Sequence, residues 1–241
     1  MAGAKAMVKP GTLYGVGVGP GDPELITLKA WKLISNAPVI AYLAANGKES
    51  TARDIARPFL PPSARHLVID MPMRVERGPG ERAYDSGAAA IAAELDTGHD
   101  VVMLCEGDPF FYGSFMYIFS RLAKAYPCVV VPGVTSITAS AASLRRPLSA
   151  RNEVVKVLPA TLPEDRLRDE LMTAESAAII KVGRHLPKIR TILGLLDLAS
   201  RAHVIIKATH EDEVVTPLLD IGQDQLPYFS TILVYSGAHS W

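Results

Sequence analysis

Two Gly-Asp-Pro sequences, at residues 21–23 and 107–109, each stand where an apolar run gives way to a helical pattern. Asp is a favoured N-cap residue and Pro a favoured first helical residue, so Asp108 and Pro109 predict the start of a helix. The bare backbone of Gly107 and the unpaired N–H groups of the helix start would then lie at the carboxyl end of a strand. Open α/β sheets bind ligands at that end, so this loop is predicted to form the floor of an active site.

A third glycine loop has the same position relative to an apolar run. Pro132-Gly133-Val134-Thr135-Ser136 follows the run 129–131 and leads into a segment of small residues. A single glycine at a strand end is most often just a turn. Three such loops in one sheet are harder to explain as turns alone, and they favour a binding site. If the strands before the two Gly-Asp-Pro sequences are neighbours, those two loops face one crevice.

The first half of the chain alternates short apolar runs with helical patterns. The expected strands are 12–18, 38–42, 66–70, 101–105 and 129–131, and the expected helices begin at Asp22 or span 51–59, 83–97, 109–125 and 135–144. Gly78-Pro79-Gly80 makes 71–82 an expected mobile loop. Strands that alternate with helices are typical of βαβ units, so we predict a mostly parallel five-stranded sheet.

The pattern breaks at Arg145–Arg151, where we expect a domain boundary that gives domains 1–146 and 147–241. The second half again mixes strands and helices. Its expected strands are 153–158, 177–182, 204–206 and 230–235, with helices at 164–172 and 186–196. The closing strand need not be parallel to the others. We therefore predict two α/β domains, the second with a mixed sheet, and an active site in a narrow cleft between them.

Composition limits the classes of function. The chain has 241 residues, of which 49% are hydrophobic and 21% charged, so it can bury a sizeable core. The 25 basic and 25 acidic side chains cancel, which argues against a nucleic-acid partner. Cys105 and Cys128 border apolar runs, as buried thiols in a reducing compartment would, and no metal-ligand spacing includes them. Residues 1–10 do not resemble a signal peptide, and no apolar run is long enough to span a membrane, so a cytoplasmic protein is expected.

The glycine run near the N-terminus does not fit a dinucleotide site. After Gly15 and Gly17, the third glycine of the G-x-G-x-x-G pattern would fall at Pro20. The expected acidic residue is missing from Tyr42–Ala45, and no Gly-Lys-Ser/Thr phosphate loop occurs. A nucleotide-dependent oxidoreductase is therefore a disfavoured alternative. A non-enzymatic dimeric binding protein would leave the three glycine loops unexplained.

Three stretches of the sequence resemble signatures of the tetrapyrrole (corrin and porphyrin) methylases. They are Tyr14–Pro23, Glu106–Pro109 and Pro132–Ser136, and the resemblance extends over nearly the whole chain. It implies a two-domain class III methyltransferase, usually a homodimer, that binds S-adenosylmethionine in the cleft between its domains. The implied substrate is a small-molecule tetrapyrrole, and no metal cofactor is implied.

Within this family, Cys105–Ser114, Lys181–Arg184 and His210–Glu213 look most like the precorrin-2 C20-methyltransferases of cobalamin biosynthesis. The resemblance leaves open whether the precorrin-2 is metal-free or carries cobalt, and another corrin-ring C-methyltransferase is a further alternative. Methylases of this architecture also act on protein side chains or ribosomal RNA. The neutral net charge and the lack of a basic, aromatic stripe count against RNA.

The family motifs can be carried over to positions of this chain. The implied contacts to S-adenosylmethionine, mostly through backbone atoms, are Pro20, Gly107, Asp108, Phe111 or Tyr112, Thr135, Ser136, Val182 and Ala208. Glu106 departs from this pattern, because many family members have a small residue before Gly-Asp-Pro.

Methyl transfer from a sulfonium requires alignment of the reacting atoms more than a strong base. In the implied reaction a proton must still leave the C20 carbon. Acidic, His and Tyr side chains near strand ends are the candidates to accept it: Glu106, His210, Glu211 and Tyr235. Acidic or His residues at strand ends are more often solvated or capping groups.

The carboxylates of such a substrate suit Arg side chains. Seven arginines could serve: Arg74, Arg77, Arg82, Arg145, Arg146, Arg151 and Arg184. Most surface arginines are merely solvated, and of these seven we expect Arg74 and Arg184 to bind substrate. The aromatic residues of 110–117 could offer apolar walls to a flat macrocycle, although at helical spacing some must belong to the core.

Overall fold

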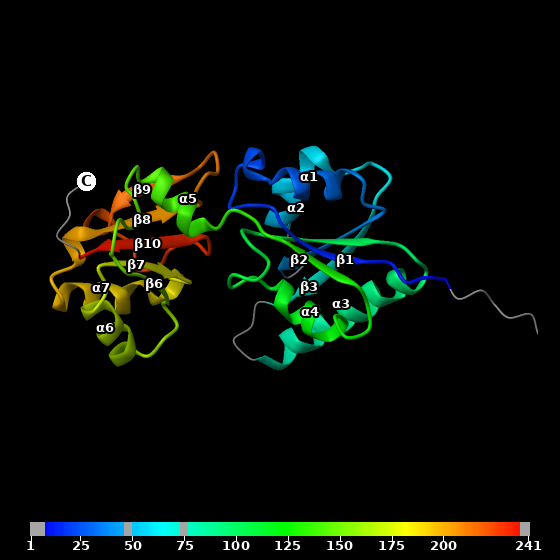
Figure 1. Cartoon of the computed structure of the whole chain (residues 1–241). Helices are drawn as coiled ribbons and strands as arrows, with labels where there is room; N and C mark the ends of the chain where they lie inside the picture. The colour runs from blue at the N-terminus through cyan, green and yellow to red at the C-terminus, as the bar shows by residue number, and fades with distance from the viewer. Residues whose placement is uncertain (1–7, 46–49, 73–76, 237–241) are drawn as a thin grey trace, which may run out of the picture. The chain divides into compact units, whose positions relative to one another are not determined.

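The computed structural model describes residues 8–45, 50–72 and 77–236 (Figure 1). Internal contacts divide the chain into two compact units, residues 1–135 and 136–241. This division falls ahead of the boundary expected between residues 146 and 147. The reason is that helix α5 (Ser136–Ser143) packs on strand β10 (Ser230–Tyr235) of the second sheet.

The first unit is a five-stranded parallel sheet, as the sequence predicts. Its strands are β1 (Leu13–Gly17), β2 (Val39–Ala45), β3 (Arg65–Met71), β4 (Val101–Cys105) and β5 (Cys128–Val131). Its helices are α1 (Leu28–Ser35), α2 (Thr51–Ala56), α3 (Arg77–Asp96) and α4 (Phe115–Leu122). The strands lie in the order β3-β2-β4-β1-β5, and every pair is parallel.

Helices cover both faces of this sheet. Figure 1 shows α1 and α2 on one side and α3 and α4 on the other. Ile91 and Phe115 pack with Met103 in one core, and Ile34 packs with Val102 in the other. A parallel strand that is covered on both faces has a continuously apolar sequence, because the side chains on both faces are buried. This is why every residue of β4 is buried.

Glycine allows two helices to approach the sheet closely. A Cβ at Gly15 in β1 would lie 2.3 Å from the ring of Phe115, so this aromatic ring rests directly on the strand. A Cβ at Gly87 in α3 would lie 2.7 Å from Ile69 of β3. Helix α3 therefore lies close against strand β3 at the edge of the sheet.

The second unit is built on a mixed sheet, also as predicted. Its strands are β6 (Val155–Pro159), β7 (Ser176–Ile180), β8 (Ala202–Ile206), β9 (Val214–Pro217) and β10, and its helices are α5, α6 (Glu164–Met172) and α7 (Leu186–Leu195). The order is β6-β7-β10-β8-β9. Strands β6 and β7 are parallel, whereas β10 runs antiparallel to both β7 and β8. Strand β9 was not expected, because its four residues are mostly exposed and end in proline.

The helix starts predicted from the two Gly-Asp-Pro sequences are wrong. Asp22 caps only a 3₁₀ turn, Pro23–Leu25, and α1 begins later behind its own N-cap, Thr27. Asp108 likewise caps a turn, and α4 begins at Phe115. The physical reason in the second case is Tyr112, whose φ of 56° lies in the left-handed region and interrupts any helix from Pro109.

Helix α3 begins at Arg77, so the predicted loop 71–82 is helical in its second part, and residues 73–76 lie outside the described residues. The proline at position 79 falls in the first helical turn, where its missing N–H is not needed. In the described part of the chain, α3 is the longest helix but too polar to cross a membrane. No other helix there is both long and apolar enough to do so.

The carboxyl ends of β4, β1 and β5 meet through glycine backbone atoms. A Cβ on Gly17 would lie 2.6 Å from the carbonyl oxygen of Gly107 and 2.7 Å from Cα of Gly133. A Cβ on Gly133 would lie 2.1 Å from the same oxygen. These distances are too short for any side chain. We call Gly17, Gly107 and Gly133 the glycine junction.

We expect Gly133→Ala to destabilise the first unit by about 2 kcal/mol or more, because the new methyl group has no room against backbone. Gly80→Ala is the matched control in the same unit. It lies in the first turn of α3 with 3.8 Å to the nearest atom, and alanine there should stabilise the helix by about 0.5–1 kcal/mol. Urea denaturation of both variants tests this. Equal effects would contradict the close packing of the junction.

Candidate active site

The two Gly-Asp-Pro loops face each other, as expected for strands that are neighbours. Strands β1 and β4 pair directly, and the loops that follow them form an isolated bridge between Gly19 and Gly107. The Gly107 N–H donates to the Gly19 carbonyl at 2.8 Å, and the Gly19 N–H donates to the Gly107 carbonyl at 3.3 Å. Both glycines have positive φ, 80° and 62°. The bridge fixes the backbone of both loops beyond the end of the sheet.

The carboxylate of Asp108 joins the loop after β4 to the loop after β5. One of its oxygens accepts hydrogen bonds from the N–H groups of Phe110 and Phe111, at 2.9 and 3.1 Å. The other accepts from the N–H of Gly133 at 3.1 Å. Both oxygens are therefore engaged within the protein. A ligand at this position would meet the backbone of the loop rather than a free carboxylate.

Open space lies beside Gly107, in contrast to its neighbours in the junction. A Cβ there would come no closer than 3.8 Å to the Val134 carbonyl oxygen and 4.0 Å to Cα of Thr135. Pro20 is buried directly after the bridged Gly19. The structure thus brings four sequence-predicted residues of the first unit to one place: Pro20, Gly107, Asp108 and Thr135.

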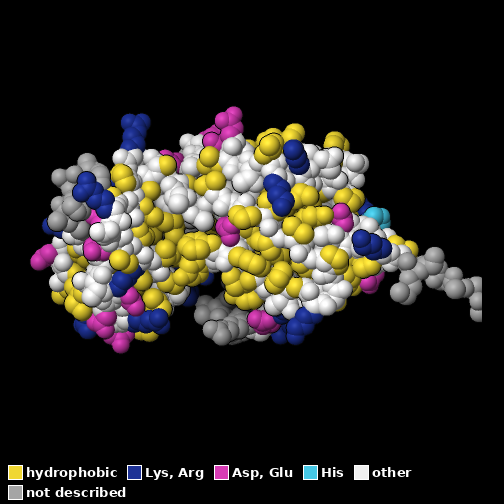
Figure 2. Space-filling view, viewed as in Figure 1, with side chains coloured by type: hydrophobic (Ala, Val, Ile, Leu, Met, Phe, Trp, Pro, Cys, Tyr) yellow, Lys and Arg dark blue, Asp and Glu magenta, His cyan; other side chains and the backbone are white. Residues whose placement is uncertain are grey.

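The aromatic segment after Asp108 divides into exposed and buried rings. Phe110, Phe111, Tyr112 and Tyr117 are exposed, whereas Phe115 is fully buried against β1. Figure 2 shows hydrophobic side chains gathered over the region of α4 on the face it displays. Phe110 and Phe111 donate their N–H groups to Asp108, so these two exposed rings lie close to the glycine junction, whereas Tyr117 stacks on Tyr84 of α3. Phe115 belongs to the core, as helical spacing required of some of these rings.

Glu106 is partly buried at the end of β4. Its Oε1 accepts a hydrogen bond from the N–H of Ala52, in the first turn of α2, at 3.2 Å. Burial raises the pKa of the Glu106 carboxyl, and its backbone hydrogen bonds oppose that rise. The neighbouring Cys105 thiol has a pKa raised well above its usual value, mainly by burial and further by the charges of Glu106 and Asp108. A carboxyl group with a raised pKa can exchange a proton closer to neutral pH.

In the second unit, β7 and β8 end in similar backbone turns. Lys181 and Lys207 directly follow the two strands, with φ values of 57° and 50°. The next residues, Val182 and Ala208, are buried. The segment 226–229 connects these ends, because Leu226 donates its N–H to the Gly183 carbonyl and Lys207 donates its N–H to the Phe229 carbonyl. Val182 and Ala208 therefore lie at the same end of the second sheet.

Glu213 holds the turn after β8, a role that the sequence does not predict. Its Oε2 accepts hydrogen bonds from the N–H of Thr209, at 2.5 Å, and from the Ser143 hydroxyl of α5, at 2.6 Å. Thr209 has a φ of 67°, so this bond supports a backbone conformation that is unfavourable for threonine. His210 follows, and its Nε2 is buried without a hydrogen-bond partner among the described residues. Glu211 is exposed.

Tyr235 lies at the opposite end of the second sheet from Val182 and Ala208. Because β10 is antiparallel to β7, Tyr235 pairs with Ser176, the first residue of β7. The guanidinium of Arg146 lies 3.8 Å from the centre of the Tyr235 ring. Burial raises the pKa of the Tyr235 hydroxyl, and the Arg146 charge opposes this. The structure does not bring Tyr235 to the other candidate proton acceptors of its unit, His210 and Glu211, which follow the opposite end of the sheet.

The remaining predicted residues are exposed or outside the described chain. Ser136 is the exposed first residue of α5. Arg184 is exposed in the turn Gly183–His185 and forms no ion pair with a described carboxylate. Arg74 lies outside the described residues. In the described ranges, no group of three His, Cys, Asp or Glu side chains could hold a metal ion.

Comparison with curated sequences finds relatives over nearly the whole chain. A precorrin-2 C(20)-methyltransferase from Sinorhizobium is 38% identical and covers 93% of this chain and 95% of its own length. A cobalt-precorrin-2 C(20)-methyltransferase from Salmonella typhimurium is 30% identical, with 93% and 96% coverage. The cobalamin biosynthesis protein CobIJ of Mycobacterium bovis is 40% identical over 94% of this chain. This chain spans only 46% of the length of that mycobacterial relative.

Solved structures share the fold. A cobalt precorrin-4 methyltransferase has a TM-score of 0.75 and 25% identity, covering 93% of this chain and 94% of its own. The uroporphyrin-III C-methyl transferase of Thermus thermophilus, complexed with S-adenyl homocysteine, has a TM-score of 0.70 and 23% identity, with 94% and 98% coverage. The family model for tetrapyrrole (corrin/porphyrin) methylases matches residues 12–220. The two-sheet architecture, the paired glycine loops and this match show that the chain belongs to the tetrapyrrole methylase family.

Proposed function

We propose that this chain transfers a methyl group from S-adenosylmethionine to C20 of precorrin-2, giving precorrin-3A. The observation that carries the proposal is the match to the Sinorhizobium precorrin-2 C(20)-methyltransferase over 95% of that protein's length. The glycine junction supports the donor part, because it presents bare backbone at strand ends in a chain of the methylase family.

The backbone groups exposed at the strand ends of the first unit can recognise the chemical groups of S-adenosylmethionine. S-adenosylmethionine carries amino, carboxylate and nucleoside groups that backbone N–H and C=O groups can recognise. Gly107 faces open space bordered by Val134 and Thr135, while Asp108 fixes the surrounding loop. We propose that Pro20, Gly107 and Thr135 contact the donor through their backbones. Asp108 acts by holding the loop, and the exposed rings of Phe111 and Tyr112 border the donor.

Residues of the second unit are proposed as further contacts. Val182 and Ala208 present small or apolar surfaces after two strand ends with left-handed residues. Such backbone conformations cost free energy and often occur at functional sites. Glu213 supports the turn that carries Ala208 and Thr209. Ser136 and Arg184 stay proposed contacts to donor and substrate carboxylate, respectively, since both are exposed.

When bound, the sulfonium supplies an electrophilic methyl group. The residues of the chain then have to orient the macrocycle, exclude water and accept the proton that C20 loses. Glu106 suits the last role because its carboxyl has a raised pKa, and His210 suits it because its buried Nε2 is unpartnered in the described structure. Glu211 is a weaker candidate as an exposed side chain, and Tyr235 lies at the far end of its sheet.

Cobalt-loaded precorrin-2 is the second candidate substrate. It is favoured by the match to the Salmonella cobalt-precorrin-2 C(20)-methyltransferase over 96% of that protein's length.

We also infer a cytoplasmic location. Two free thiols, Cys105 and Cys128, support it, because free cysteines are typical of a reducing compartment.

Incubation with S-adenosylmethionine and either metal-free or cobalt-loaded precorrin-2 tests the function. We expect the mass of one of the two to rise by one methyl group, with a changed absorption spectrum. No methyl transfer to either tetrapyrrole would refute the proposal.

Ala208→Leu should weaken binding of S-adenosylmethionine by about tenfold or more in calorimetry, because the added side chain would occupy the donor's place. Ala142→Leu, on the exposed side of α5, is the control. Equal binding by the two variants would contradict the contact proposed for Ala208.

Asp108→Asn is expected to lower the free energy of unfolding by about 1–3 kcal/mol. An amide in place of the carboxylate cannot accept from all three N–H groups, so at least one of them, such as the partly buried N–H of Gly133, loses its partner. Asp22→Asn is the matched control in the other Gly-Asp-Pro sequence. Its carboxylate caps an exposed turn through the Glu24 N–H, and its loss should cost less than about 1 kcal/mol. Chemical denaturation measures both, and equal losses would argue against the role given to Asp108.

Glu106→Gln should make the stability of the first unit less dependent on pH. A carboxyl group whose pKa is raised on folding favours the folded state below its unfolded pKa, about 4.3, and this contribution is lost as pH rises through the folded pKa. We therefore expect wild type to lose stability relative to the variant as pH rises from about 4 towards neutrality. Urea denaturation across this range measures the difference, with Glu211→Gln as the reference for removing one charge. A constant difference would show that the carboxyl is not perturbed.

A further inference from the structure

The turn after β8 consists of residues 207–213, and we call it the β8 turn. It contains no glycine, yet Lys207 and Thr209 have φ values of 50° and 67°, in the left-handed region. Ala208 lies between them and is 7% exposed. Positive φ is least favourable for β-branched residues such as threonine. The conformation of the β8 turn therefore has to be stabilised by groups that bind its backbone.

Glu213 is such a group. Its Oε2 accepts hydrogen bonds from the N–H of Thr209, at 2.5 Å, and from the hydroxyl of Ser143, at 2.6 Å. Ser143 is the last residue of α5. Both bonds are partly buried, where hydrogen bonds are less weakened by water. The carboxylate is thus fixed to a helix and in turn holds the left-handed backbone of Thr209.

A second carboxylate of the β8 turn contributes less. Asp212 forms an ion pair with the Nζ of Lys207, and the two side chains are 64% and 39% exposed. Exposed ion pairs stabilise a protein little, because water and salt screen them. This pair joins two side chains across the turn. Glu213 is the carboxylate that binds the strained backbone directly.

The peptide group between Ala208 and Thr209 transmits the position of Glu213. The described peptide bonds are trans, and the N–H and C=O of a trans peptide point in opposite directions. Since the N–H of Thr209 points to Glu213, the carbonyl of Ala208 points away from it. The described residues donate no hydrogen bond to this carbonyl. It can therefore accept one from a ligand, in a direction that Glu213 sets.

We propose that Glu213 is a positioning residue that sets the affinity for S-adenosylmethionine without touching it. This rests on the proposed function, in which Ala208 contacts the donor. Glu213 keeps Thr209 left-handed, which aims the Ala208 carbonyl at an amino or hydroxyl group of the donor. Without the carboxylate, Thr209 relaxes to negative φ, the peptide group rotates and the donor loses this acceptor.

The role is geometric, so it does not require the negative charge. In Glu213→Gln, the amide oxygen can accept from the N–H of Thr209, and the amide NH₂ can donate to the oxygen of Ser143. Glu213→Ala retains neither bond. A carboxylate that instead attracted the positive sulfonium of the donor would lose its effect in both variants. The two variants therefore separate positioning from charge.

Calorimetric binding of S-adenosylmethionine and of S-adenosylhomocysteine, which has no positive sulfur, tests the proposal. Glu213→Ala should weaken binding of both by the same factor, about tenfold or more, and Glu213→Gln should stay within about threefold of wild type. Asp220→Ala, which removes an exposed carboxylate of the same unit, is the control for charge. Circular dichroism checks that each variant folds. A loss confined to S-adenosylmethionine, or equal losses in the Gln and Ala variants, would overturn the proposal.

Thr209→Gly tests whether the effect passes through the backbone of Thr209. Glycine adopts positive φ without the steric cost, so a glycine turn depends less on the carboxylate. In that background we expect Glu213→Ala to weaken binding less than about threefold. The full loss in the glycine background would overturn the proposal. A wild type that binds neither compound would overturn both the donor site and this role, whereas equal binding by wild type and Glu213→Ala would overturn this role alone.

Discussion

The first unit depends on how closely three backbone segments approach one another at the ends of β4, β1 and β5. The carbonyl oxygen of Gly107 lies where the side chains of residues 17 and 133 would otherwise be. This contact excludes water and side chains, so the loops can be held only by backbone hydrogen bonds and by Asp108. A site built from backbone has no rotamers to order when a ligand binds. Its recognition surface is therefore largely preformed.

The second unit also fixes its backbone at strand ends, but it does so with residues other than glycine. Where the first sheet uses glycine, β7 and β8 place lysines in left-handed conformations, which cost free energy. The cost is offset locally: segment 226–229 bonds to both ends, and Glu213 ties the Thr209 turn to α5. The first unit thus fixes the backbone after three strand ends and the second unit after two, with bare glycine backbone in the first and buried apolar residues in the second. In each unit the candidate contacts are defined by conformation more than by side-chain chemistry.

The sequence predicted what depends on local pattern and missed what depends on distant partners. The strand runs, the parallel and mixed sheets and the facing Gly-Asp-Pro loops follow from periodicity and from glycine at strand ends. The start of α4 was wrong because the left-handed Tyr112 has no sequence signal comparable to glycine. Glu213 was missed since its partner Ser143 lies 70 positions away. Tyr235 was grouped with the other candidates because the direction of β10 cannot be read from its apolar run.

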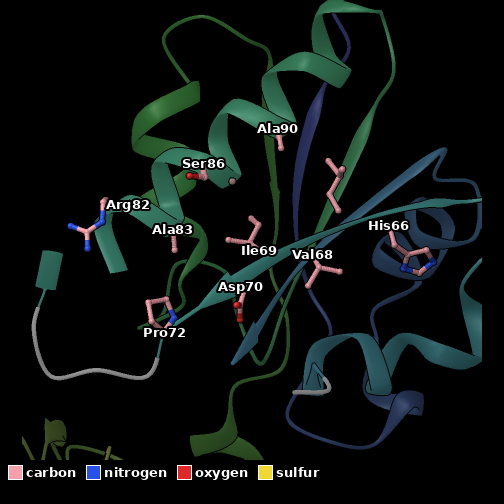
Figure 3. A pocket seen from close by; sticks show the side chains of 11 residues that line it. His66, Val68, Ile69, Asp70, Pro72, Arg82, Ala83, Ser86 and Ala90 are labelled. Carbon is pink, nitrogen blue, oxygen red and sulfur yellow. The ribbon is translucent and has the colours of Figure 1, made fainter. Parts of the chain in front are cut away.

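The strand order also separates the two surfaces that the first unit offers. In β3-β2-β4-β1-β5, the glycine junction belongs to β4, β1 and β5, and the open edge belongs to β3. Neighbouring strands lie about 4.8 Å apart, so β3 is about 10 Å from β4 and further from β1. A strand added at β3 would extend the sheet on the side away from β5. The same topology that gathers the glycine loops at β4, β1 and β5 therefore separates them from the open edge of β3 (Figure 3), so a change at that edge need not disturb the glycine junction.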